Sequence, residues 1–219
     1  MTAGPGGEAA GAGAARAGVA GGGPAAGLVL AAGAGTRFGT APKQLARLGD
    51  RPLLQWAIDA QTAVDPALLD PVVVVLGSHA AEIRAAIDLG RAVAVVCPDW
   101  EAGQSASLRC GLQAIGDADR VVVTLGDAPF VSSELIARFA GDGEPTPARA
   151  VYDARPGHPV ALGREQIAAL RAAGPDRDEG ARGLLRGART VEAGHLCSGR
   201  DVDTREDLEE VRDEARAVI

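Results

Sequence analysis

Two cations beside a glycine-rich segment are the first residues of this chain whose types and spacing could do chemistry. Arg37 and Lys43 lie in the run GAGTRFGTAPK, residues 33–43, which follows the apolar residues Leu28, Val29 and Leu30. Glycines let the backbone approach an anion closely and leave N–H groups open to it, while an arginine and a lysine supply the charge that a triphosphate requires. The segment therefore predicts a phosphate-binding loop after a buried strand.

The spacing of this loop excludes two well-known phosphate loops. A Walker loop needs Gly-Lys followed by Ser or Thr, whereas Lys43 here follows Pro42. A dinucleotide fingerprint reads G-x-G-x-x-G, whereas Gly33, Gly35 and Gly39 read G-x-G-x-x-x-G. A third kind of phosphate loop is therefore implied.

Carboxylates at two later points could hold a metal ion against phosphates. Asp127 follows the run VVVTL, and Asp201 and Asp203 stand at i, i+2 spacing, which places both on one face of an extended segment. Mg²⁺ is typically held by one or two carboxylates together with substrate phosphates and waters. The alternatives are an acidic residue of a turn for Asp127 and capping of the helix after Thr204 for the pair.

Strands that alternate with helices must position these residues. Apolar runs predict strands at 72–76, 92–97 and 120–125, separated by helices that contain residues 53–58, Ile83 with Ile87, and 105–115. Ser78 is expected to cap the helix of Ile83 and Ile87, and Ser132 or Ser133 to cap a further helix. We expect an α/β fold, a single-domain Rossmann-like and mostly parallel sheet with helices on both faces, in which ligands bind at the carboxyl ends of strands. The glycine loop and Asp127 should therefore meet.

Changes in composition along the chain suggest its organisation. Residues 1–25 are almost entirely Ala and Gly and predict a disordered tail, leaving 26–219 as one domain. A nucleotide half at about 26–140 precedes an acceptor-side half at about 141–219, whose prolines predict an irregular, partly antiparallel addition. This second half should contain helices at 164–172 and 180–186, a strand near 190–191, and a last helix begun by a capping box of Thr204 and Asp207.

Bulk composition disfavours several classes of function. The formal net charge of −7 disfavours partners such as nucleic acid or an anionic membrane, and no apolar run is long enough to span a bilayer. The three cysteines are odd in number and far apart, which argues against a disulfide framework or a zinc site. We take a cytoplasmic location as the default.

Six short motifs in order resemble a known family. They are LAAGxGxRFGxxPKQL, GQSASLRxGL, LGDAP, RxGHPV, DxGARxLL and DVDTxEDL, and they span roughly residues 27–212. In this order they resemble molybdenum cofactor cytidylyltransferases and their relatives in the MobA-like NTP transferase superfamily. The resemblance implies a fold of the nucleotide-diphospho-sugar transferase type.

The resemblance also implies roles for individual residues. The nucleotide would be met by Ala31, Ala32, Gly33, Gly35, Arg37, Lys43, Ser105 and Ser107. The metal would be held by Asp127 with Asp201 or Asp203, and the acceptor would lie near Gly157, His158, Pro159, Gly180 and Arg182. Arg37, Lys43 and Asp127 would be the catalytic residues. His158 has an alternative interpretation as a packed structural residue, because the attacking phosphate needs no general base.

What the resemblance implies for function is a Mg²⁺-dependent nucleotidyl transfer from an NTP to a phosphorylated small-molecule acceptor. Alanine at the third position of LAAG favours CTP, and the motif set favours the molybdenum–molybdopterin cofactor and enzymes that deliver or receive it. Ala128 and Arg205 depart from the usual family residues, which leaves the acceptor open. The alternatives are another acceptor (a sugar phosphate, methylerythritol phosphate or phospholactate) or a nucleotide-binding accessory protein without turnover.

Overall fold

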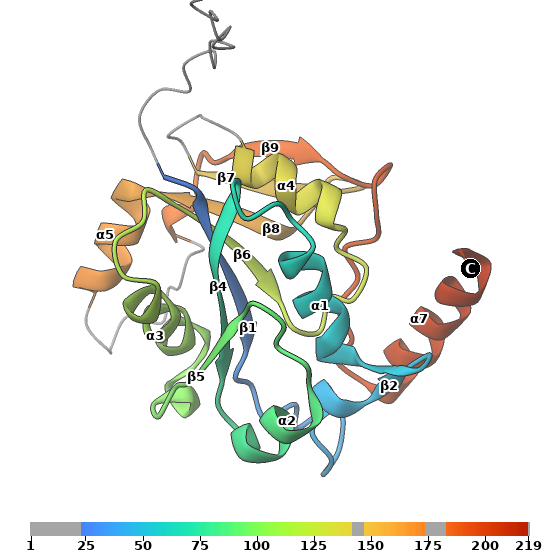
Figure 1. Ribbon diagram of the computed structural model, residues 1–219. Coiled ribbons are helices and arrows are strands. Elements are labelled where there is room, and N and C mark those ends of the chain that lie inside the picture. The colour runs from blue at the N-terminus through green and yellow to red at the C-terminus, as the bar shows by residue number, and fades with distance from the viewer. Residues whose placement is uncertain (1–22, 142–146, 174–182, 219) are drawn as a thin grey trace, which may run out of the picture.

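A seven-stranded sheet forms the centre of the molecule (Figure 1). The computed structural model describes residues 23–141, 147–173 and 183–218, with side chains through residue 213. The strand order is β5-β4-β1-β6-β8-β7-β9. The strands are β1 (Ala25–Ala31), β4 (Leu69–Leu76), β5 (Val93–Val96), β6 (Arg120–Leu125), β7 (Ala148–Tyr152), β8 (Arg155–Gly163) and β9 (Arg189–Glu192). A separate two-stranded hairpin consists of β2 (Arg47–Leu48) and β3 (Arg51–Pro52).

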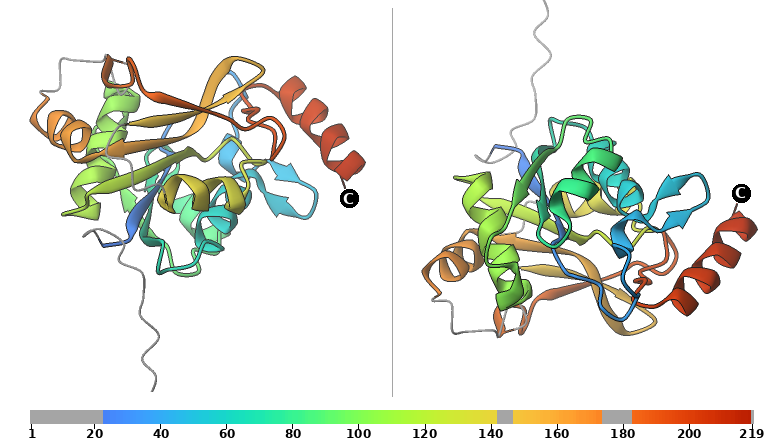
Figure 2. Two further views of the ribbon diagram at one scale, coloured as in Figure 1. Left: turned by 90° about the horizontal axis from the view of Figure 1, so that it is seen from above. Right: turned by 90° about the horizontal axis from the view of Figure 1, so that it is seen from below.

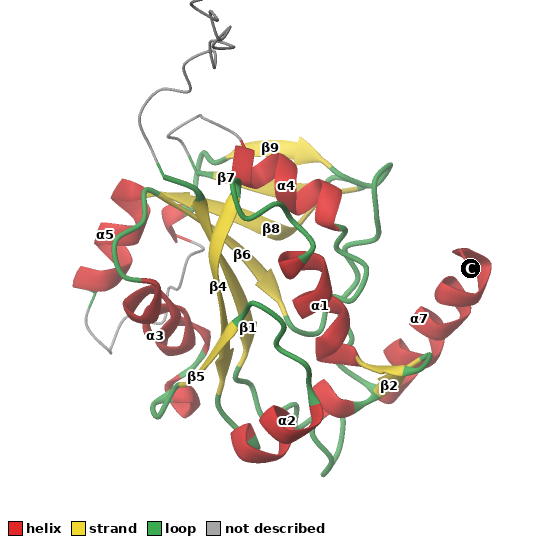
Figure 3. Ribbon diagram, viewed as in Figure 1, coloured by secondary structure: helices red, strands yellow, loops and turns green. Residues whose placement is uncertain are grey.

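The parallel part of the sheet matches its sequence pattern. All seven residues of β1 are buried, because β4 and β6 flank this strand in parallel and helices cover both faces. Figure 3 shows red helices on both sides of the yellow strands of the sheet. A strand buried on both faces has no polar side to alternate with, so its sequence is a continuous apolar run. The predicted α/β class and mostly parallel sheet are confirmed.

The antiparallel addition lies on the other side of β6. β8 pairs antiparallel with β6 and β7, and β7 then pairs parallel with β9. This confirms the partly antiparallel second half and extends the sheet beyond β6, the strand that Asp127 follows.

Helices cover both faces of the sheet. The helices are α1 (Leu53–Thr62), α2 (Ala80–Ala86), α3 (Gln104–Ile115), α4 (Ser133–Gly141), α5 (Arg164–Ala172) and α7 (Arg205–Val218), with short 3₁₀ turns η1 (Lys43–Leu45) and η2 (Trp100–Ala102). α1 and α4 lie on one face and α3 and α5 on the other, as the views along the sheet show (Figure 2). Each face buries its own apolar cluster.

A third, smaller cluster lies away from the sheet. It joins residues from both ends of the domain: Phe38, Leu48, Leu53, Val202, Leu208 and Val211. The glycine loop is thereby packed against the last helix.

Some predicted boundaries differ in the structure. Ala25 already belongs to β1, because its N–H donates to the Leu68 carbonyl, while residues 1–22 lie outside the described part of the chain. Ser78 does not cap α2, since its N–H bonds to the Ala32 carbonyl and His79, with φ of 56°, takes the N-cap position. The predicted helix at 180–186 falls partly outside the described residues, with 183–184 helical and 185–187 a turn. Within the described ranges, no helix has the length and apolarity to cross a membrane.

Candidate active site

Lys43 brings together residues that are far apart in the sequence. Its Nζ atom donates a 2.6 Å hydrogen bond to Oδ2 of Asp127 and a 3.0 Å bond to Oδ1 of Asp203. Lys43 opens the 3₁₀ turn η1, and its side chain is only 9% exposed. The predicted phosphate-binding lysine and two predicted metal ligands therefore form one ionic cluster.

Arg37 adds a second cation to this cluster. Its Nη2 atom lies 2.8 Å from Oδ2 of Asp203, and its side chain is 72% exposed. Burial alone would lower the pKa of Lys43, but the charges of Asp127 and Asp203 and their hydrogen bonds outweigh burial and raise this pKa. Lys43 is therefore a fixed, permanently charged group, and Arg37 is a cation open to solvent.

A tight turn after β6 places Asp127 beside the glycine loop. The N–H of Gly126 donates to the Leu30 carbonyl, and a Cβ at Gly126 would lie 2.8 Å from the Ala31 Cβ. The Asp127 carbonyl in turn accepts a 2.9 Å bond from the N–H of Val202. This backbone bond docks the segment that carries Asp201 and Asp203 against the end of β6.

A capping box at the start of α7 orients Asp203. Thr204 and Asp207 exchange hydrogen bonds, and Oδ2 of Asp207 also accepts a bond from the N–H of Asp203. The bonds from Thr204 lower the pKa of Asp207. Because Asp207 caps the helix, the carboxylate of Asp203 is left to face Lys43 and Arg37.

The cluster has the features of a cation site. Oδ1 of Asp127 is buried and has no hydrogen-bond partner. Burial, followed by the charges of Asp127 and Asp203, raises the pKa of Asp201, so added positive charge would be favourable there. Among the described side chains, no three His, Cys, Asp or Glu residues are grouped closely enough to hold a metal by themselves. A Mg²⁺-type ion that also takes phosphate oxygens fits this donor set.

Gln44 holds the glycine loop, a role that the sequence motif did not reveal. Its Nε2 atom donates to the carbonyls of Ala31 (3.0 Å) and Gly33 (2.8 Å). Gly35 has φ of +62°, and a Cβ there would lie 3.0 Å from the Cβ of Lys43. The side chain of Gln44 thus fixes the loop, and Gly35 lets the loop backbone approach Lys43 closely. The signal available in the sequence was the polar residue Gln44 directly after the motif lysine, which could have indicated a side chain that bonds to the loop.

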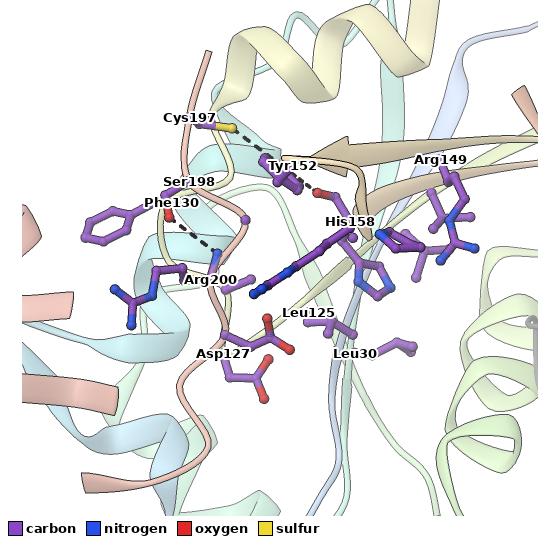
Figure 4. Close-up of a pocket in the computed structure, with 18 of the residues that line it drawn as sticks. Leu30, Leu125, Asp127, Phe130, Arg149, Tyr152, His158, Cys197, Ser198 and Arg200 are labelled. Carbon is purple, nitrogen blue, oxygen red and sulfur yellow. Dashed lines mark hydrogen bonds between the residues drawn. The ribbon is translucent and has the colours of Figure 1, made fainter. Parts of the chain in front are cut away.

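A large pocket opens beside this cluster (Figure 4). Its volume is about 1620 Å³, and the predicted residues that line it are Arg37, Ser105, Asp127, Gly157, His158, Asp201 and Asp203. The predicted residues Ala31, Ala32, Gly33, Gly35, Lys43 and Ser107 lie outside its lining; Lys43 and Ser107 are buried. Gly180 and Arg182 lie outside the described residues.

A tyrosine supports the far wall of the pocket. Tyr152 donates a 2.6 Å hydrogen bond to the His158 carbonyl, and its hydroxyl lies 3.8 Å from the Cys197 sulfur (Figure 4). Added Cβ atoms at Gly157 and Gly199 would approach the Tyr152 ring to 2.8 and 2.2 Å. Burial, followed by the charge of Arg149, lowers the pKa of His158 to about 4, so its imidazole is neutral at pH 7.

One unusual residue of the sequence contacts the loop. Arg205, which stands where relatives usually have proline, places its guanidinium 5.4 Å from the centre of the Phe38 ring. A cation over an aromatic ring is attracted to it. Arg205 thus connects α7 to the glycine loop.

A family model and several known proteins match this chain. The model of the MobA-like NTP transferase domain matches residues 27–193. Bifunctional protein GlmU of Mycobacterium sp. (strain KMS) is 40% identical over 118 residues, 50% of this chain but only 23% of GlmU. The chain thus matches about a quarter of the length of that relative. Nicotine blue oxidoreductase of Paenarthrobacter nicotinovorans is 31% identical over 196 residues, covering 83% of this chain and 93% of the relative.

Solved structures share the fold over nearly their whole length. Rv0371c of Mycobacterium tuberculosis H37Rv, in a complex with manganese, is 27% identical with a TM-score of 0.67, covering 87% of this chain and 98% of its own. A nucleotidyl transferase from Methanothermobacter thermautotroptrophicus (Mth528) is 25% identical with a TM-score of 0.71, covering 90% of this chain and 99% of its own.

Proposed function

The chain belongs to the family of MobA-like NTP transferase domains, and from this premise we propose that it is a nucleotidyltransferase. An oxygen of an acceptor phosphate attacks the α-phosphorus of an NTP, a new P–O bond forms, and the bond to the β-phosphate oxygen breaks to release pyrophosphate. The observation that carries the proposal is the cluster of Lys43, Asp127 and Asp203, in which both carboxylates line the large pocket.

The residues of this cluster position and neutralise the reacting phosphates. Gln44 keeps the glycine loop open for the triphosphate, and Arg37, which is exposed at the pocket, binds its oxygens. The ammonium group of Lys43, held by Asp127 and Asp203, adds positive charge beside the phosphates. The main task is to hold two anions in line, so electrostatics and positioning supply the catalysis. No general base is required, which agrees with the neutral His158.

A divalent metal fits the carboxylates of this chain. Asp127, with its unpartnered buried Oδ1, and Asp201 or Asp203 would hold it, and Mg²⁺ is the ion that we favour. When bound, the ion neutralises charge on the α-phosphate and its leaving group. Rv0371c, a relative of similar fold, has been solved with manganese, which supports a divalent ion here.

CTP and the molybdenum–molybdopterin cofactor are the substrates that we favour. The residues LAAG of the loop and the six motifs support this pair. Ligand pockets commonly measure about 300–1000 Å³, so the volume of about 1620 Å³ leaves room for a nucleotide beside a bulky acceptor.

The test is pyrophosphate release by the purified full chain with Mg²⁺, CTP and the molybdopterin acceptor, alongside GTP and ATP. We expect release with CTP and a loss of about 100-fold or more in kcat for Asp127→Asn, which keeps the shape of the side chain but removes its charge. Asp117→Asn, at an exposed position outside the pocket, is the matched control and should keep full activity.

The outcomes separate the alternatives. Release with another acceptor but not with the pterin would keep the reaction and change the substrate. Nucleotide binding without turnover on any acceptor would instead indicate an accessory protein. Full activity of Asp127→Asn at saturating Mg²⁺ would contradict the metal assignment.

A redox reaction is a second candidate. The chain aligns with 93% of the length of nicotine blue oxidoreductase but with only 23% of the length of GlmU. Such an activity would change the redox state of nicotine blue in the presence of an added electron donor or acceptor and would release no pyrophosphate. Running both assays on one preparation discriminates the two functions.

A further inference from the structure

Arg149 is a cation on an otherwise apolar part of the pocket wall. It lies on β7 and pairs with Val160 of β8, and both residues line the pocket. Its neighbours Ala148 and Ala150 point to the opposite face, where they belong to the other core cluster. Strand alternation therefore directs Arg149 into the pocket, beside Val160 and Leu162.

The guanidinium of Arg149 has no counter-charge among the residues that the structure describes. Its Nε atom is buried without a hydrogen-bond partner, and among the described residues no carboxylate forms an ion pair with it. Its charge acts on the adjacent His158, whose pKa it lowers in addition to the effect of burial. The side chain of Arg149 as a whole is half-buried, and a buried polar atom such as its Nε costs stability unless something compensates it.

The position of Arg149 relative to the reacting cluster suggests its partner. In Figure 4, Arg149 lies on the same side of the pocket as His158 and away from Asp127. Arg37 and Lys43 already serve the end of the pocket at Asp127. A single anion at the reacting cluster would therefore leave Arg149 without a counter-charge.

We propose that Arg149 binds a second oxyanion of the acceptor, a carboxylate or a phosphate, at the end of the pocket remote from Asp127. The proposal rests on the proposed function and specifies its substrate class. The acceptor carries two anionic groups joined by a body that packs against Val160, Leu162 and Tyr152. Arg149 thereby selects such acceptors over those with one phosphate, because a guanidinium pairs with an oxyanion through two hydrogen bonds.

Arg155 offers a matched comparison within the same pocket. It lines the pocket from the first residue of β8, but its side chain is exposed to solvent. An exposed arginine gains little from pairing with an anion, whereas a half-buried one such as Arg149 gains more. Loss of Arg149 should therefore weaken anion binding much more than loss of Arg155.

The test uses inorganic phosphate as the probe and the full chain saturated with Mg²⁺ and a non-hydrolysable CTP analogue. Phosphate is titrated while the ring signals of the three histidines are followed by NMR, with His158 assigned from His158→Gln. We expect a saturable shift of the His158 signals and an affinity at least about tenfold weaker in Arg149→Met. Arg149→Lys should lose less affinity than Arg149→Met, because it keeps the charge but not the two parallel hydrogen bonds. Arg155→Met should bind phosphate nearly as well as wild type.

Equal phosphate affinity in Arg149→Met and wild type, or an equal loss in Arg155→Met, would overturn the proposal. Circular dichroism and the affinity for the CTP analogue are measured on the same samples, so a misfolded variant is recognised. If Arg149→Met is misfolded, the phosphate affinity of Arg149→Lys tests the proposal instead. Failure of the CTP analogue to bind would instead count against the proposed function, while phosphate binding at Arg149 stays measurable.

Discussion

Lys43 pairs with carboxylates 84 and 160 residues away in the sequence, and this pairing defines the resting state of the site. Three acidic side chains, Asp127, Asp201 and Asp203, face two cations, Lys43 and Arg37. Burial first, and then this surplus of negative charge, raises the pKa of Asp201, and the surplus favours a further cation. Lys43 therefore contacts the same carboxylates that a metal ion would bind.

His158 gives a prediction about pH. Its pKa is lowered to about 4 in the folded chain from the ordinary histidine value of 6.5, so the unfolded chain binds more protons between these values. The free energy of unfolding should therefore fall as the pH falls from about 6.5 to about 4, by up to about 3 kcal/mol. Denaturant unfolding across this range measures the slope.

A matched pair of variants isolates this effect. His158→Gln should flatten the slope above pH 5, where carboxylates contribute little, while His195→Gln at an exposed position should retain it. If both variants keep the slope of the wild type, the burial of a neutral His158 is not its cause.

At the scale of elements, the sequence predicted the strands, helices and caps that follow from the local pattern of apolar and polar residues. The valine runs of β4 and β6, the span of α5 and the capping box of Thr204 and Asp207 are all present. Each depends on local pattern, so a single sequence reveals it.

Features that depend on tertiary contacts were not predicted. The position of Ser78 is fixed by a bond to the end of β1, and the contact of Gln44 with two loop carbonyls exists only once the loop has folded. Arg149 reads as an ordinary strand residue until β8 and the pocket are in place. Local patterns do not encode such contacts between distant segments.

The close packing of α3 on the sheet leads to a prediction. A Cβ at Gly111 would lie 2.4 Å from Leu28 Cδ1 and 2.8 Å from Val75 Cγ2. We expect Gly111→Ala to destabilise the fold by about 1–3 kcal/mol through overpacking, which exceeds the gain in helix propensity of up to about 1 kcal/mol. Because Ser105 lines the pocket from the same helix, affinity for nucleotide should fall as well.

Gly141 provides the control, since it ends α4 and an added Cβ there would have nothing within 4 Å. Thermal unfolding of both variants measures the difference, and Gly141→Ala should stay within about 0.5 kcal/mol of wild type. Equal stability of Gly111→Ala and wild type would show that α3 moves away from β1 without cost.

At the scale of the whole molecule, the third apolar cluster joins the two ends of the domain. Phe38 from the glycine loop and Leu53 from α1 pack with Leu208 and Val211 from α7. Figure 2 shows α7 beside the hairpin of β2 and β3 and apart from the sheet. The last helix therefore depends on this cluster for its position, and Asp203 lies immediately before that helix.

Leu208→Ala should therefore affect both stability and metal-dependent binding. Leu208 is 5% exposed, and truncation of such a side chain costs about 2–5 kcal/mol. Loss of its contacts loosens the segment of Asp203 and the glycine loop together, so affinity for a CTP analogue with Mg²⁺ should fall as the midpoint of denaturant unfolding falls. Leu68→Ala, at a position 41% exposed, should change neither quantity appreciably. A separate early transition in Leu208→Ala, with nucleotide affinity intact, would mean that α7 unfolds independently of the loop, because one cooperative domain gives a single transition.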